Sequence, residues 1–178
     1  GGSGVLGAEF GGLLWMFASL GHVCLLIAFV GAWFRRDYRP EELNPTWFLP
    51  GAGIMTSSLM WPGFGPVELP TFTLAVGATM WVMLLPPIFR RMIVDPSVEP
   101  KLRPTLFIIA APFGLMAGSQ ITLFPEIPIV VPILFLFGGA FLLMVLLSQA
   151  WFLRGAGPAL TWWSSTFPIA VLTAGFFR

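Results

Sequence analysis

Six apolar segments, each close to the length needed to cross a membrane, occupy most of this 178-residue chain. They cover residues 10–34, 45–62, 70–89, 104–124, 128–153 and 160–177. A helix needs ~20 apolar residues to cross the hydrocarbon core of a bilayer. Only 10% of the residues are charged, against roughly 25% in an average soluble domain. A core of this size cannot hide so much apolar surface. The sequence therefore predicts one all-α, polytopic transmembrane domain over residues 1–178.

Basic residues alternate from one connecting loop to the next. The loops after the first, third and fifth segments carry Arg35, Arg36 and Arg39, then Arg90, Arg91, Lys101 and Arg103, then Arg154. The loops after the second and fourth segments carry no Lys or Arg, only Glu68 and Glu126. Because basic loops face the cytoplasm, we expect a multi-pass protein of the inner (plasma) membrane. Its basic loops would be cytoplasmic, and both ends of the chain would lie outside.

Every second segment has an internal proline, at Pro50, Pro112 and Pro168. Proline removes a backbone donor and clashes with the preceding turn, so each of these helices is predicted to bend or open. A straight helix, a basic loop and a bent helix thus form a unit that recurs three times. Repeated helical hairpins are common in transporters. The alternative is that proline is simply frequent in membrane helices.

Small and hydroxyl side chains gather around these prolines. Freed backbone groups inside a bilayer are tolerated only against protein or a watery cavity, so we expect the bent helices to surround a common path. Candidate residues lining this path are Gly51, Thr56, Ser57, Phe113, Gly114, Ser119, Ser164 and Thr166. The alternative for each is helix packing through small residues. Phe167 directly precedes Pro168, so its ring either closes the path at the bend or packs as an ordinary aromatic side chain.

The middle of every segment lacks Asp, Glu, Lys and Arg. Intramembrane ionisable groups usually mark proton relays or tight ion sites, and cation filters use acidic rings. Their absence disfavours a proton pump and a cation channel, and an uncharged path lined by hydroxyls suits weakly held anions. His22 is the one titratable residue well inside a segment, where it binds a ligand or hydrogen-bonds between helices.

Other function classes lack support. No GxSxG, HExxH, CxxC or P-loop motif is present, so no enzyme activity is expected. Cys24 is the single cysteine, and neither a metal site nor a cofactor is predicted. No basic tract indicates a nucleic-acid partner. The start, GGSGVLGAEFGG, lacks the basic region of a signal peptide and is interpreted as a linker or truncated loop. Asn44 and Pro45 are predicted as the N-cap and first residue of the second helix.

Three stretches resemble the tellurite-resistance, C4-dicarboxylate transporter and plant slow anion channel family. They are NPTWFLPGAGIM (Asn44–Met55), RPTLFIIAAPFGLMAG (Arg103–Gly118) and TWWSSTFPIAVLT (Thr161–Thr173). The resemblance implies ten helices in five hairpins, with kinked inner helices around a central pore, and a trimer with one pore per subunit. It also implies that Phe167 is the phenylalanine that occludes this pore.

On this resemblance the six segments are the fourth to ninth helices, and three of five pore helices cannot enclose a path. We therefore expect a fragment of a longer protein that forms a homo-trimer when complete. The predicted function is channel-like passage of small anions through an uncharged pore, driven by the electrochemical gradient. One alternative is a coupled carrier of C4-dicarboxylates or oxyanions such as malate, sulfite or tellurite. A second is a membrane scaffold that transports nothing.

Overall fold

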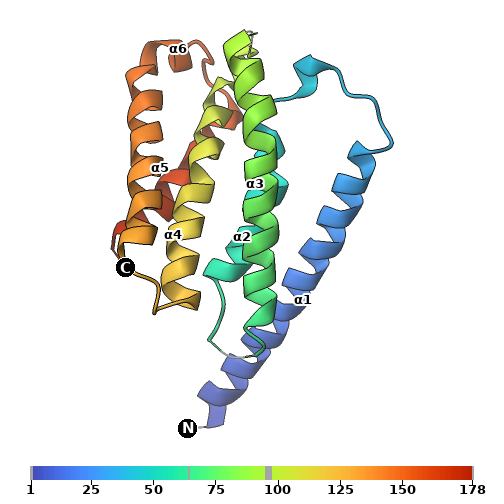
Figure 1. Cartoon of the computed structure of the whole chain (residues 1–178), viewed down its shortest axis with the longest axis vertical. Helices are drawn as coiled ribbons and strands as arrows, with labels where there is room; N and C mark the ends of the chain where they lie inside the picture. Colours follow the sequence, from blue (N-terminus) through green and yellow to red (C-terminus); the bar gives the residue numbers. More distant parts are fainter. Residues whose placement is uncertain (1, 64, 95–97, 178) are drawn as a thin grey trace.

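The computed structural model describes residues 2–63, 65–94 and 98–177, and the regular structure in these ranges is entirely helical (Figure 1). The α-helices are α1 (Gly2–Trp33), α2 (Leu49–Leu59), α3 (Glu68–Val94), α4 (Ala111–Leu123), α5 (Val130–Ser148), α6 (Ala150–Arg154) and α7 (Thr166–Phe176). Four 3-10 helices join them: η1 (Pro40–Glu42), η2 (Pro45–Phe48), η3 (Pro100–Ala110) and η4 (Leu160–Ser165). The all-α prediction is confirmed for these ranges.

Four helical segments are long and apolar enough to cross a membrane. They are Glu9–Trp33, Glu68–Val94, Pro100–Leu123 and Val130–Ser148. The other two predicted segments are helical as well, but each divides into a short 3-10 helix and an α-helix of 11 residues. By length and composition, the chain is therefore a multi-pass membrane protein with four candidate spans.

The proline-containing helices lie next to one another. α4 packs against both α2 and α7, while α3 packs mainly on α2 and α5 on α4. α1 contacts α2 at the edge of the assembly (Figure 1). The core between these layers is almost wholly apolar, with Phe48, Met55 and Leu115 fully buried.

The basic loops lie together at one end of the molecule. In Figure 1 the connections after α1, α3 and α6 are at the top, whereas those after α2 and α4 are at the bottom. One detail of the prediction is wrong, because Arg90 and Arg91 are not in a loop. α3 continues to Val94 and includes both residues, and Arg91 is only 9% exposed.

The glycine-rich start is not the predicted linker. α1 begins at Gly2 and has a helical backbone through residues 2–9. Helix formation costs about 1 kcal/mol more for glycine than for alanine. In an apolar setting an unpaired backbone amide costs several kcal/mol, which favours a helix despite the glycines.

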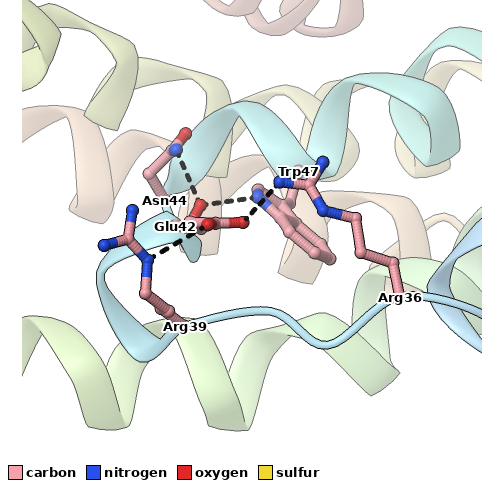
Figure 2. Close-up of polar contacts among 5 residues, drawn as sticks. All are labelled: Arg36, Arg39, Glu42, Asn44 and Trp47. Atoms are coloured by element: carbon pink, nitrogen blue, oxygen red, sulfur yellow. Dashed lines mark hydrogen bonds and ion pairs between the residues drawn. The ribbon is translucent and has the colours of Figure 1, made fainter.

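The first basic loop is closed by the side chain and carbonyl of Glu42 (Figure 2). Its carboxylate pairs with Arg36 at 3.5 Å and with Arg39 at 3.4 Å. Its carbonyl accepts hydrogen bonds from Trp47 Nε1 at 2.8 Å and Asn44 Nδ2 at 3.0 Å. The Asn44 side chain also accepts from the Thr46 amide at 3.0 Å, so the predicted N-cap is confirmed, at the start of η2. These contacts fix the backbone just before η2 and α2, which form the first proline-containing segment.

Candidate functional site

Each internal proline lies where a 3-10 helix becomes an α-helix. Pro50 and Pro112 are the second residues of α2 and α4, and Pro168 is the third residue of α7. An amide in the first turn of an α-helix has no partner within that helix, so proline is tolerated there. The expected bend within a continuous α-helix is therefore replaced by a change of helix type, from three to 3.6 residues per turn.

Two glycines predicted to line a path lie at helix–helix contacts. A Cβ atom on Gly114 would come within 2.8 Å of the Leu172 amide nitrogen in α7. A Cβ atom on Gly51 would come within 3.0 Å of Met80 Cβ in α3. Such close approach is what small residues allow in membrane helices. The packing alternative considered for these two residues therefore has direct support.

The hydroxyls of α2 and α4 are directed into the protein. Ser57 Oγ is 2.5 Å from Ser19 Oγ of α1, and Ser57 O accepts from Trp15 Nε1 at 2.9 Å. Thr56 Oγ1 donates to Gly53 O of its own helix at 2.5 Å. Ser119 is fully buried, and its hydroxyl has no partner among the described residues. Ser57 thus joins α2 to α1 instead of facing open space.

The hydroxyls of η4 bind backbone carbonyls. Ser164 Oγ is within hydrogen-bond distance of Pro104 O at 3.0 Å and of Thr161 O at 2.6 Å. Thr166 Oγ1 donates to Trp163 O at 2.7 Å. Thr161 Oγ1 donates to Lys101 O. The bonds to Pro104 and Lys101 tie η4 to η3, whereas that of Thr166, the first residue of α7, stays within its own segment. All of these bonds engage the donor protons that an anion would need.

The two aromatic candidates face different surroundings. The Phe113 ring makes an edge contact with Trp81, with 4.8 Å between centroids, and lies against Gly138 and Gly139 of α5. Phe167, by contrast, is 40% exposed. Beside it, a hollow of about 550 Å³ is lined by Pro158, Ala159, Leu160, Trp162, Trp163 and Thr166. Of the two rings, Phe167 is therefore the more exposed one.

Polar residues in α1 were missed by the sequence analysis. Trp15 and Ser19 are four residues apart, so they share a helix face, and both reach Ser57. Ser19 is 4% exposed. The sequence signal that could have identified them is this pair of polar side chains four residues apart in an otherwise apolar segment. His22 lies on the same side, with Cε1 2.8 Å from the position of a Cβ on Gly53. No hydrogen bond joins His22 to another described residue.

Comparison with known protein families identifies the family of this chain. Residues 5–178 match the family model described as voltage-dependent anion channel, SLAC1. The chain belongs to this family. This match confirms the resemblance stated above. The members of the family are membrane transport proteins and not enzymes.

Two plant channels are similar to the chain over most of its length. It is 28% identical over 160 residues to the S-type anion channel SLAH3 of Arabidopsis thaliana, which covers 88% of the chain and 25% of the relative. It is 26% identical over 169 residues to the S-type anion channel SLAH2 of the same plant, covering 93% of the chain and 32% of the relative. The chain therefore spans about a quarter to a third of these relatives. No solved structure matches it significantly.

Proposed function

We propose that this chain forms part of a pore through which small anions move down their electrochemical gradient. The observation that carries the proposal is the row formed by α2, α4 and α7, in which the 3-10 to α junctions lie on adjacent helices. Residues 45–59, 104–123 and 160–176 contain no ionisable side chain. An ion held by dipoles and hydroxyls alone leaves as readily as it enters, which conduction requires.

All six segments cross the membrane in this proposal. A 3-10 helix rises about 2.0 Å per residue and an α-helix about 1.5 Å, so η4 and α7 together measure about 28 Å. That length approaches the ~30 Å hydrocarbon core, although the α-helical part has only 11 residues. The six segments then correspond to the fourth to ninth of ten helices, with the kinked helices inside and the complete protein a homo-trimer.

Phe167 is the proposed gate of this pore. It lies at the junction of η4 and α7 and is 40% exposed. A ring in a narrow uncharged tube excludes water and closes it by dewetting. Thr56, Ser164 and Thr166 would act as wall residues. Ser164 and Thr166 would first have to release their present carbonyl partners before donating to an anion.

The test of function is anion flux through the protein that carries this chain, expressed from its complete gene and reconstituted in liposomes. A potential of 100 mV supplies ~2.3 kcal/mol per charge, so flux of chloride, nitrate, sulfite, tellurite or malate should follow the imposed potential. It should not respond to a pH gradient. Flux that requires a pH gradient would identify a coupled carrier instead. Flux equal to that of empty liposomes for every anion would identify a scaffold.

The basic loops are predicted to be cytoplasmic, because eight of the nine basic residues lie on one side of the alternating path. On a Cys24→Ser background of the full-length protein, Asp37→Cys and Pro158→Cys should resist a membrane-impermeant thiol reagent in intact cells. Pro66→Cys and Glu126→Cys, at the opposite end, should react. Permeabilised cells should label all four, which controls for accessibility. The reverse pattern in intact cells would invert the topology.

A further inference from the structure

An apolar groove runs along the outer surface between α3 and α5, with α4 beneath it. Its volume is about 500 Å³. It is lined by Leu85, Pro86, Phe89, Phe113, Gly138, Phe141 and Leu142. In Figure 1, α4 is visible between the two longer helices. None of the lining side chains can form a hydrogen bond, so the groove offers no site for water or an ion.

Gly138 and Phe113 shape the floor of this groove. A Cβ atom on Gly138 would lie 2.8 Å from Phe113 Cε1, so the ring occupies the space that a larger residue in α5 would fill. Trp81 supports the ring from behind through the edge contact. At the rim, Phe141 remains 61% exposed. The groove is therefore a depression in the apolar outer surface of the described helices.

A cation, Arg90, stands near one end of the groove. Arg90 follows Pro86 by four residues, which places it on the same face of α3 one turn nearer the basic end. It is exposed, and no carboxylate among the described residues pairs with it. α3 has 27 residues and measures about 40 Å, so it exceeds a ~30 Å hydrocarbon core by about 5 Å at each end if centred. Arg90 lies about 6 Å from the helix end, at the edge of the hydrocarbon core, from which its long side chain can reach the lipid phosphates.

We propose that this groove binds an acyl chain of an anionic phospholipid whose phosphate contacts Arg90. The apolar groove extends from Arg90 toward the membrane interior, as a lipid tail extends from its head group. The anionic class follows from Arg90, because an unpaired guanidinium attracts a headgroup with net negative charge more strongly than a zwitterionic one. The proposal rests on the groove and on Arg90 and not on the proposed path, so it does not depend on anion conduction.

The headgroup contact is tested by native mass spectrometry of the full-length protein in detergent, titrated with phosphatidylglycerol or phosphatidylcholine. The wild type should retain phosphatidylglycerol in preference to phosphatidylcholine. Arg90→Gln should lower phosphatidylglycerol retention roughly fivefold, the effect of one surface charge, and leave phosphatidylcholine unchanged. Arg35→Gln is the matched control, since Arg35 is also exposed at the basic end but follows α1. Equal losses in both variants would overturn the contact.

The acyl-chain contact is tested separately by filling the groove. Leu85→Trp should reduce retention of both lipids, whereas Leu25→Trp on the exposed face of α1 should not. A photoreactive acyl chain on phosphatidylglycerol provides a test on the unmodified protein. Its adducts should fall within residues 85–89 and 138–142. Adducts elsewhere would overturn the proposal.

Discussion

Replacing Phe167 with alanine should raise anion conductance without changing which anions pass. The proposed gate is a ring that blocks water at the η4–α7 junction, and removing it lowers the barrier to entry. A barrier lower by about 1.4 kcal/mol corresponds to a tenfold faster passage, and we expect an increase of roughly that size. Phe167→Leu should fall between alanine and wild type. The measurement is conductance per folded full-length protein in liposomes, with selectivity read from reversal potentials.

Phe176→Ala is the matched control for this experiment. Phe176 belongs to the same helix and is 49% exposed, close to the 40% of Phe167. Nine residues separate the two, which places them on opposite helix faces, and Phe176 lies near Phe137 of α5, with centroids 6.1 Å apart. Its truncation should leave conductance unchanged. If Phe167→Ala conducts no better than Phe176→Ala, Phe167 is a packing residue and not a gate.

Gly77→Ala should destabilise the protein strongly, although alanine normally favours a helix by about 1 kcal/mol. A Cβ atom at this position would lie 2.1 Å from Met55 Cγ and 2.7 Å from Gly51 O. Met55 can change rotamer, but the carbonyl belongs to the backbone of α2, so α2 and α3 must separate. Overpacking of this kind costs about 1–3 kcal/mol. The expected result is a lower melting temperature of the full-length protein in detergent.

Gly21→Ala provides the control, because no atom lies within 4 Å of the added Cβ in α1. Its melting temperature should stay the same or rise. A double variant, Gly77→Ala with Met55→Ala, should not restore stability, since the clash with Gly51 O remains and truncation of the buried Met55 costs about 2–5 kcal/mol of its own. Equal melting temperatures for Gly77→Ala and Gly21→Ala would show that α2 and α3 are not packed as closely as described.

The existence of the apolar segments and the alternating path of the chain could be predicted from the sequence, because both depend only on residues close together in the chain. Transfer of apolar residues into lipid depends on composition over about 20 residues, and loop charges report on membrane sides without reference to the fold. The N-cap at Asn44 is equally local, because its side chain accepts from an amide only two residues away. Segment ends were less predictable. α3 retains Arg90 and Arg91 because long basic side chains can remain at a helix end near the interface.

The role of each small residue could not be predicted in this way. Helices that are apolar on all sides carry no periodic signal of which face meets a neighbour. The sequence therefore could not distinguish a path-lining role for Gly51 and Gly114 from a packing role. Only the positions of α3 and α7 show that both lie at helix contacts. Phe113 and Phe167 each stand next to a proline, yet the Phe113 ring packs against α5 whereas Phe167 is 40% exposed.

By itself, the sequence determined an all-α membrane chain, its up-and-down path and the three proline positions, since each depends on neighbouring residues and the solvent. The tertiary structure decided which helices lie side by side, which glycines hold them together and which aromatic ring is left exposed. It also decided that the prolines begin α-helices after 3-10 segments. These outcomes depend on contacts between segments 20 or more residues apart, such as Ser19 with Ser57, and burial of a side chain is set by the helix that packs against it.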